Sequence, residues 1–254
     1  MKAGHRVLDP DTPAQTQHGL CALAVMTKAP RAGQVKTRLV PPLTPEEAAS
    51  LNVCFLRDTA NAITAALRET ARGVGVYTPR GAEAAYQNIL PEDFFLVPQR
   101  GEDFGERLFF AAEDLFKCGF TSVCLIDSDS PTVWPEVFVQ AVEFLSSPDD
   151  RVAIGPSDDG GYYLIGLKKP HREMFERIDW STERVFEQTM QRAAEIGVEV
   201  KLLPVSYDVD DRATLQRLCS ELFGENAGDG VAPNTRKFLR EIIEREGRDR
   251  IWPE

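Results

Sequence analysis

Short apolar runs alternate with amphipathic stretches along most of the chain. This alternation predicts strand–helix units around a mostly parallel sheet. Buried strands are expected at 20–27, 73–78, 94–97 and 120–126. Helices are expected at 45–68, 82–88, 103–117 and 135–145. The pattern indicates an α/β fold class, and open sheets of this class bind their ligands at the carboxyl ends of the strands.

The pattern changes at Arg151. Apolar runs at 152–155 and 162–167 flank the segment 157–161 (Ser-Asp-Asp-Gly-Gly), which is typical of a tight turn between two strands. The remaining expected elements are a helix at 182–196, a strand at 198–204, and helices at 212–223 and 233–245. No repeat or linker interrupts residues 20–254, so we expect a single domain. Residues 1–19 are polar and are expected to form a flexible extension.

The net charge of the chain limits the classes of partner that it can bind. The chain has 29 basic and 40 acidic side chains, a net charge of -11, which argues against binding nucleic acid or an anionic membrane surface. No apolar run approaches the roughly 18 residues of a membrane span. The five cysteines are odd in number, lack a C-x-x-C pair, and include two inside apolar runs. Reduced thiols and a cytoplasmic location are therefore expected.

An acidic pair follows the clearest central strand. Asp127 and Asp129 lie directly after the apolar run that ends at Ile126. Carboxylate oxygens with spare coordination positions suit Mg²⁺ or Mn²⁺, which bridge protein carboxylates to substrate phosphates. The alternative is a polar turn that Pro131 ends. Because two acids at a strand end repel each other unless a cation holds them, we favour a metal site.

A basic segment follows the first expected strand, inside a window without carboxylates. It contains the predicted phosphate-binding residues Lys28, Arg31, Lys36 and Arg38. Gly33 permits close approach of the backbone to a phosphate, and Arg38 could bind one in fork geometry. The segment matches neither the Walker A loop nor G-x-G-x-x-G, and a solvated basic loop is the alternative.

Two further acidic segments carry candidate chemistry. Asp210 could be an additional metal ligand, although Asp210 or Asp211 could instead cap the helix after them. Asp159 is a candidate general base toward an acceptor hydroxyl, and a simple turn is its alternative.

Aromatic and polar side chains complete the predicted site. Trp180 either forms an aromatic wall or, with Ser181 and Thr182, caps a helix. Gln99 could bind a base edge and Arg107 a phosphate, although a helix start explains most of that segment. The three scattered histidines and the lack of G-x-S-x-G argue against a zinc site or a serine hydrolase.

Seven segments, in order within residues 20–218, carry a family resemblance. They are 27–39 (TKAPRAGQVKTRL), 105–107 (GER), 128–131 (SDSP), 155–156 (GP), 158–166 (DDGGYYLIG), 180–182 (WST) and 208–210 (DVD). Together they resemble a bacterial family of nucleotide-diphospho-sugar transferase-like proteins, formerly a domain of unknown function. Some of its members are assigned as arsenosugar biosynthesis glycosyltransferases.

The resemblance implies a GT-A-like fold, a three-layer α/β/α arrangement, and a relation to molybdenum-cofactor and phospholactate guanylyltransferases. It implies that Asp129 binds the metal with help from Asp210, and that Lys36 and Arg38 bind phosphates. The glycine-rich loop that opens the nucleotidyltransferases is absent here. Asp127 replaces an expected glycine, so which acid of the pair binds the metal stays open, with Asp129 favoured.

The leading hypothesis is a Mg²⁺- or Mn²⁺-dependent glycosyltransferase with a nucleotide-sugar donor and a small-molecule acceptor. Asp129 and Asp159 are its predicted catalytic residues, and a homodimer is left open as its assembly. The nearest alternative is a nucleotidyltransferase that joins an NTP to a phosphorylated small acceptor. A haloacid-dehalogenase-like phosphatase with an aspartate nucleophile and a non-catalytic binding module are further alternatives.

Overall fold

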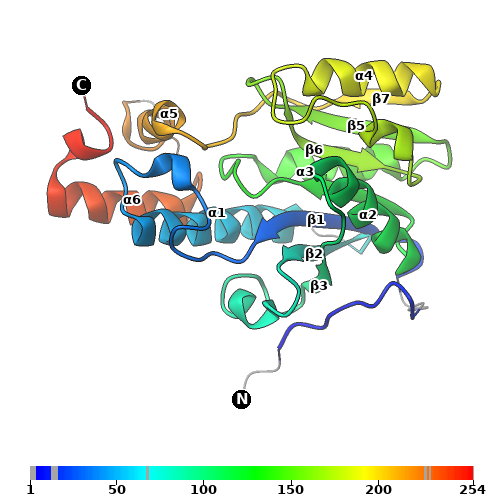
Figure 1. Cartoon of the computed structure of the whole chain (residues 1–254), viewed down its shortest axis with the longest axis horizontal. Coiled ribbons are helices and arrows are strands. Elements are labelled where there is room, and N and C mark those ends of the chain that lie inside the picture. Colours follow the sequence, from blue (N-terminus) through cyan, green and yellow to red (C-terminus); the bar gives the residue numbers. More distant parts are fainter. Residues whose placement is uncertain (1–3, 13–16, 67–68, 226–227, 229, 254) are drawn as a thin grey trace.

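One seven-stranded sheet organises the chain. The computed structural model describes residues 4–12, 17–66, 69–225, 228 and 230–253. The strand order is β3-β2-β1-β4-β6-β5-β7 (Figure 1). The strands are β1 (Cys21–Lys28), β2 (Ala71–Thr78), β3 (Phe95–Pro98), β4 (Ser122–Ile126), β5 (Arg151–Pro156), β6 (Tyr162–Leu167) and β7 (Glu199–Leu202). Only β6 runs antiparallel to its neighbours, so the predicted mostly parallel sheet is confirmed.

Helices cover both faces of this sheet. The α-helices are α1 (Pro45–Ala66), α2 (Phe104–Lys117), α3 (Pro135–Leu145), α4 (Val185–Glu195), α5 (Arg212–Phe223) and α6 (Pro233–Glu246). Short 3₁₀ turns occur at Thr37–Leu39, Glu83–Tyr86, Arg172–Phe175 and Arg248–Arg250. Apolar residues of α1 and α3 pack on one face, and those of α2 and α4 on the other. None of the helices described combines the length and apolar character that crossing a bilayer requires.

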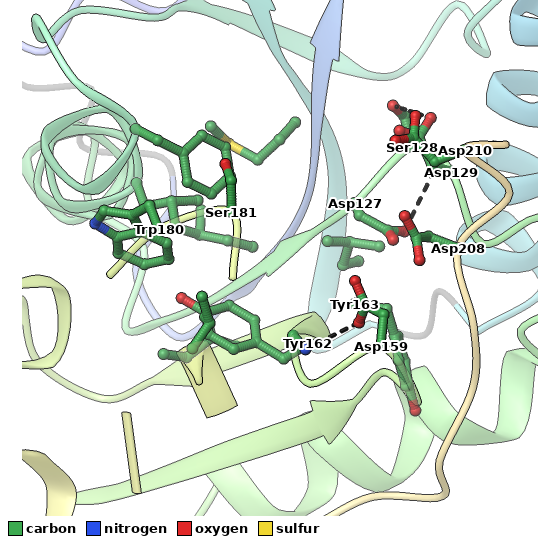
Figure 2. Close-up of a pocket in the computed structure, with 18 of the residues that line it drawn as sticks. Asp127, Ser128, Asp129, Asp159, Tyr162, Tyr163, Trp180, Ser181, Asp208 and Asp210 are labelled. Carbon is green, nitrogen blue, oxygen red and sulfur yellow. Dashed lines mark hydrogen bonds between the residues drawn. The ribbon is translucent and has the colours of Figure 1, made fainter. Parts of the chain in front are cut away.

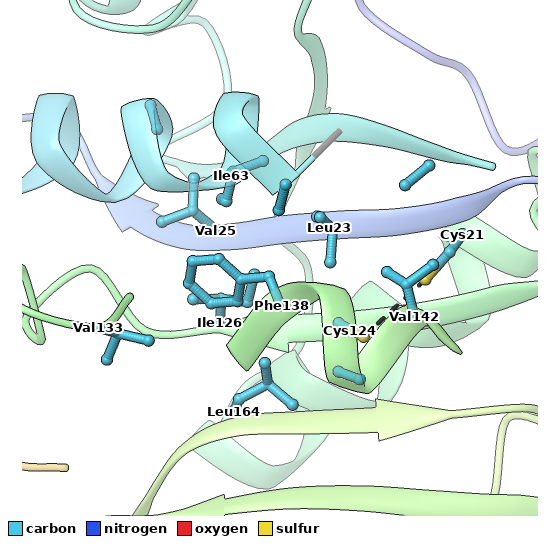
Figure 3. Packing of buried hydrophobic residues seen from close by; sticks show 14 of the residues in the cluster. Cys21, Leu23, Val25, Ile63, Cys124, Ile126, Val133, Phe138, Val142 and Leu164 are labelled. Carbon is cyan, nitrogen blue, oxygen red and sulfur yellow. Dashed lines mark hydrogen bonds between the residues drawn. The ribbon is translucent and has the colours of Figure 1, made fainter. Parts of the chain in front are cut away.

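The side-chain alternation of the central strand explains why the sheet is covered on both faces. In β1, Leu23 and Val25 point to the α1–α3 face, where they join Phe138 (Figure 3). Ala22 and Ala24 belong to the opposite cluster. All four β1 side chains are fully buried. A strand buried on both faces needs an unbroken apolar run, which is how β1 and β4 appear in the sequence.

A third apolar cluster lies beyond the sheet, where α5 and α6 pack against α1. The buried Asp58 of α1 strengthens this junction. Its carboxylate accepts hydrogen bonds from the backbone N–H groups of Asn234 (3.0 Å) and Thr235 (2.8 Å), at the first turn of α6. A carboxylate at a helix N-terminus satisfies donors that have no partner within the helix. These hydrogen bonds thereby join α6 to α1.

Several expected boundaries differ from the structure. The helix expected at 82–88 is a 3₁₀ turn, Glu83–Tyr86, and α4 begins at Val185 rather than at 182. Part of the expected flexible extension is docked instead. Leu8 is buried, and its N–H donates to the carbonyl of Leu96 in β3 at 2.8 Å. Burial of an apolar side chain together with edge-strand pairing holds this part in place.

The register brings the chemistry-bearing loops to one edge of the sheet. β1 and β4 are parallel, and Val25 pairs with Ile126 near the carboxyl ends of both. Because β6 is antiparallel to β4, the turn before Tyr162 lies at that same edge. β5 and β7 also end there. The segments after β1, β4 and β7 and before β6 therefore meet.

Candidate active site

A cavity of about 610 Å³ opens where these segments meet. One half is lined by carboxylates that follow β4 and β7 or precede β6, and the other half by aromatic side chains (Figure 2). The carboxylate half contains Asp127, Asp129, Asp159, Asp208 and Asp210. A concave site with convergent polar groups at the carboxyl ends of α/β strands is where a ligand is expected.

The loop that leaves β4 holds its two acids in different environments. The N–H of Asp127 donates to the carbonyl of Tyr163 at 2.9 Å, and its Oδ2 accepts from Ser130 Oγ at 2.7 Å. Burial and the charge of Asp129 raise the pKa of Asp127 to about 8. Asp127 is therefore mostly protonated at neutral pH unless a cation lies beside it. Asp129 is instead paired with a cation.

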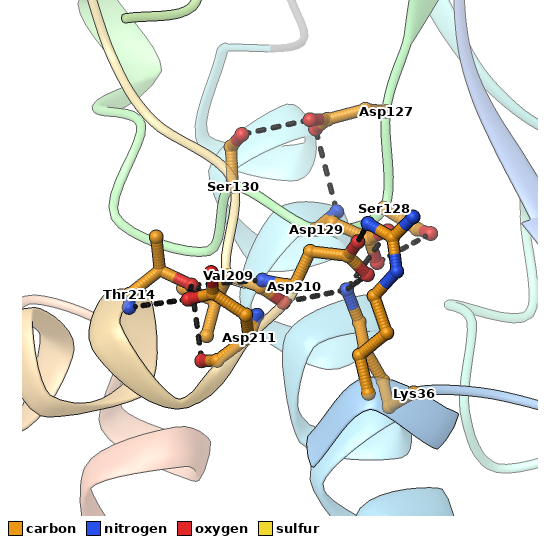
Figure 4. A network of polar contacts seen from close by, with 10 residues as sticks. Lys36, Asp127, Ser128, Asp129, Ser130, Val209, Asp210, Asp211 and Thr214 are labelled. Carbon is orange, nitrogen blue, oxygen red and sulfur yellow. Dashed lines mark hydrogen bonds and ion pairs between the residues drawn. The ribbon is translucent and has the colours of Figure 1, made fainter. Parts of the chain in front are cut away.

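That cation is Lys36, whose ammonium points toward Asp129 and Asp210 (Figure 4). Lys36 Nζ is 2.9 Å from Asp129 Oδ2 and 3.9 Å from Asp210 Oδ1, and it donates to the carbonyl of Val209 at 2.7 Å. Its side chain is 3% exposed. Lys36 and Arg38, two of the four predicted cations, thus lie against the acids that follow β4 and β7. Lys36 contacts the loops rather than the cavity itself.

In the segment after β7, the neighbouring residues Asp210 and Asp211 make different contacts. Asp210 binds Arg38 Nη1 at 2.7 Å and lines the cavity. Asp211 caps α5 by accepting from the N–H of Thr214 at 2.8 Å, in a reciprocal capping box. The two alternatives left open by the sequence therefore hold for different residues: Asp211 is the cap, and Asp210 faces the site. Burial and the charge of Asp159 raise the pKa of Asp208 to about 6.

The acids at this edge fit a divalent cation that takes part of its shell from substrate. Within the described residues, no group of three or more His, Cys, Asp or Glu side chains is placed to enclose a metal. Asp129 and Asp210 nevertheless both lie within 4 Å of one cationic nitrogen, Lys36 Nζ. Mg²⁺ is commonly held by one or two carboxylates and completed by water and phosphate oxygens. The pair suits such an ion and not a fully protein-caged metal.

The turn before β6 presents one acid to the cavity and turns its neighbour away. Asp159 lines the cavity and accepts from the N–H of Gly161 at 2.9 Å. Asp158 pairs with Arg217 on α5. Gly160 has φ +88, and a Cβ there would collide with the backbone carbonyl of Glu183. Only glycine permits this approach, which brings the turn against the segment that carries Trp180.

The opposite wall of the cavity is aromatic. Trp180 makes edge contacts with Phe104 and Tyr162, at ring-centroid distances of 5.1 and 6.4 Å. Gly105 allows this packing, because a Cβ there would lie 2.5 Å from Trp180 Nε1. α4 begins only at Val185, so Trp180 does not cap this helix, and its ring lines the cavity.

Five predicted ligand residues, Lys36 among them, do not line this cavity. Lys28, the last residue of β1, and Arg31, on the loop after it, are exposed. Gln99 Nε2 donates to the carbonyls of Thr27 (3.2 Å) and Val76 (2.8 Å), so its amide N–H groups join β1 to β2. Arg107 is exposed and donates to the backbone carbonyls of its own helix entry.

Other lining residues were left out of the predicted site. They include Met26, Phe104, Tyr162 and Asp208. Tyr162 follows the Gly-Gly pair and begins a strand, and this position in the sequence could have identified it as a lining residue. Phe104 is 52% exposed although it opens a helix with a strongly apolar face, and exposure of this kind is visible only in the structure.

Comparison with known proteins agrees with this fold. Residues 60–182 match the model of a family described as "Uncharacterized protein conserved in bacteria (DUF2064)". The predicted family resemblance is confirmed. A crystal structure from Desulfovibrio desulfuricans G20, described as a candidate nucleotide-diphospho-sugar transferase, is 29% identical with a TM-score of 0.78, covering 91% of this chain and 99% of that one. The fold of the present chain is therefore GT-A-like, as predicted.

A more distant structure shares the fold alone. CMP:2-keto-3-deoxy-manno-octonic acid synthetase, solved with CTP, is 11% identical with a TM-score of 0.51, covering 80% of this chain and 98% of that one. No curated protein matches the sequence.

Proposed function

We propose that the protein is a metal-dependent glycosyltransferase that uses a nucleotide-sugar donor and a small-molecule acceptor. The observation that carries the proposal is the convergence of Asp129, Asp210, Lys36 and Arg38 at the edge of the cavity. Acids and cations placed together in this way suit a diphosphate bridged by a divalent ion. The similarity to the Desulfovibrio protein, over nine-tenths of the chain, supports the same class of donor.

Each proposed role follows from the position of the side chain. Asp129 and Asp210 would hold Mg²⁺ or Mn²⁺, with Asp127 beside them. When bound, the ion would neutralise the charge that develops on the departing diphosphate. Arg38, whose side chain is 74% exposed, can exchange its bond with Asp210 for one with a donor phosphate. Asp159, on the far side of the carboxylate half, would accept the proton of the acceptor hydroxyl.

The proposal extends to compartment and organisation. Residues 20–254 would form the catalytic domain. All five cysteines are buried and free, which suits a reducing compartment, and we place the protein in the cytoplasm.

Product analysis tests the proposal directly. The protein is incubated with Mn²⁺ or Mg²⁺ and a panel of nucleotide sugars and NTPs, and the released phosphates are separated by anion-exchange chromatography. We expect a nucleoside diphosphate from one nucleotide sugar, with activity abolished by EDTA and by Asp129→Asn. Asp158→Asn is the matched control, since Asp158 binds Arg217 outside the cavity. Pyrophosphate released from an NTP would overturn the proposal in favour of nucleotidyl transfer.

A further inference from the structure

The charge on the cavity wall is strongly one-sided. Among the described residues that line the cavity, six are acidic and one is basic. The acids are Asp127, Asp129, Asp159, Glu183, Asp208 and Asp210. The basic one, Arg38, is already bound to Asp210. An anionic ligand is therefore disfavoured everywhere except beside Arg38.

Four of these acids form two sets: one set makes ion pairs with basic side chains, and the other set does not. Asp129 and Asp210 contact Lys36 and Arg38, which is where we place the donor diphosphate. Asp159 and Asp208 make no ion pair with any described residue, and their charges repel each other. The second molecule in the reaction must therefore meet uncompensated negative charge.

The aromatic wall lies across the cavity from these unpaired acids (Figure 2). Tyr162 and Trp180 are half-buried, while Phe104 is 52% exposed. Aromatic side chains that remain accessible inside a cavity offer apolar surface to the C–H groups or flat face of a ring. The acceptor is thus received between hydrogen-bond acceptors on one side and apolar surface on the other.

We propose that the acceptor is a phosphate-free ring compound bearing hydroxyl groups, bound between Asp159 and Asp208 on one side and Tyr162 and Trp180 on the other. Hydroxyl groups donate hydrogen bonds to unpaired carboxylates, whereas a phosphate ester would be repelled by them. The inference rests on the proposed function for its reaction. The acceptor oxygen forms a bond to the anomeric carbon, the bond from that carbon to the diphosphate oxygen breaks with its electron pair, and the hydroxyl proton passes to Asp159.

Pairs of ring compounds that differ only in a phosphate group test whether the acceptor is phosphate-free. Glucose and glucose 6-phosphate, ribose and ribose 5-phosphate, and inositol and inositol 1-phosphate are each added with the active donor, and the rate of nucleoside diphosphate release is measured. We expect the best phosphate-free member to exceed its phosphorylated partner at least tenfold in kcat/KM. A phosphorylated member that equals or exceeds its partner overturns the inference, and so does a failure of every phosphate-free ring to raise release above the donor-only rate.

The identity of the donor and the class of the acceptor are tested by different outcomes of these assays. If an NTP turns out to be the donor, the proposed function fails, and the same pairs are assayed with that NTP by pyrophosphate release. A second measurement adds inorganic phosphate to the protein saturated with Mg²⁺ and the nucleoside diphosphate product. We expect no rise in Tm, because the acceptor half repels anions; a saturable rise would contradict the inference.

Two tryptophans provide a matched pair of variants. Trp180→Ala should raise KM for the acceptor about tenfold, and Trp180→Phe should restore most of the loss. Trp134→Ala is the control, since Trp134 is 53% exposed and lies outside this cavity. Equal effects of Trp180→Ala and Trp134→Ala on KM would contradict the inference.

Discussion

Lys36 Nζ lies 2.9 Å from Asp129 Oδ2, although one residue follows β1 and the other follows β4. The same ammonium donates to the carbonyl of Val209, after β7. One buried side chain thus joins three loops that come from distant parts of the sequence. Lys36 also adopts a left-handed backbone conformation, with φ 50. A strained residue is retained where its surroundings hold it in place, and here those surroundings are the proposed metal ligands.

Replacing Lys36 by Met should therefore cost stability. The change leaves Asp129 and the Val209 carbonyl without their partner. Removing one member of a buried ion pair costs about 3–5 kcal/mol, and we expect about 2–3 kcal/mol because Asp129 is 33% exposed. Urea denaturation at neutral pH measures the loss. Lys28→Met, at the exposed end of β1, should change stability by less than about 0.5 kcal/mol; equal effects would refute the role assigned to Lys36.

Adjacent acids after β7 should differ sharply in Mn²⁺ affinity. Asp210→Asn removes a carboxylate that faces the cavity, and we expect at least a tenfold weaker affinity in calorimetric titration. Asp211→Asn should leave the affinity unchanged, because Asp211 caps α5 and asparagine caps equally well. Asp129→Asn should weaken binding at least as much as Asp210→Asn. If Asp211→Asn proves the more damaging change, the proposed ligand set is wrong.

The convergence at the sheet edge could be predicted from the sequence, because it depends on periodicity and register. Apolar runs identify β1 and β4, and parallel strands send the residues after them to the same edge. The segments after these two strands must then meet, whatever the details of the loops. The antiparallel β5–β6 pair could be predicted for a similar reason, from the turn residues between two apolar runs.

The direction of individual side chains could not be predicted in this way. Lys36 looks like a phosphate ligand in sequence, yet its ammonium is buried against Asp129 and Val209. Gln99 looks like a base-reading residue, yet its N–H groups bind backbone carbonyls. Both outcomes depend on tertiary contacts with residues far away in the chain. The local sequence pattern carries no information about such partners. It also does not indicate that α4 begins only at Val185, after Trp180.

The contribution of Asp127 and Asp208 to the stability of the metal-free protein should fall as pH rises from about 4 to about 8. The pKa of Asp127 is raised to about 8 in the folded chain, whereas an unfolded aspartate titrates at about 3.9. Between these values the folded state binds a proton that the unfolded state does not, so increasing pH favours unfolding. Asp208, with its pKa raised to about 6, acts in the same direction.

Asp127→Asn should remove much of this dependence. Tm measured in EDTA should be close to wild type near pH 4 and should exceed it increasingly up to pH 8. Asp93→Asn, at an exposed site away from the cavity, serves as the control and should follow the wild-type profile. Parallel wild-type and Asp127→Asn profiles would show that Asp127 ionises normally. Adding Mn²⁺ should reduce the difference, since a nearby cation favours the charged carboxylate.

Gly160→Ala should be far more damaging than Gly197→Ala, although both glycines have positive φ. At Gly197 a new Cβ would meet nothing within 4 Å, so only the backbone preference is lost, about 1 kcal/mol. At Gly160 the Cβ would collide with the backbone carbonyl of Glu183, and we expect about 3 kcal/mol or more in urea denaturation. The collision also separates the Asp159 turn from the Trp180 segment, so KM for the acceptor should rise in Gly160→Ala alone. Similar losses of stability in both variants would mean that the turn can shift to accommodate the new Cβ without disturbing the wall of the cavity.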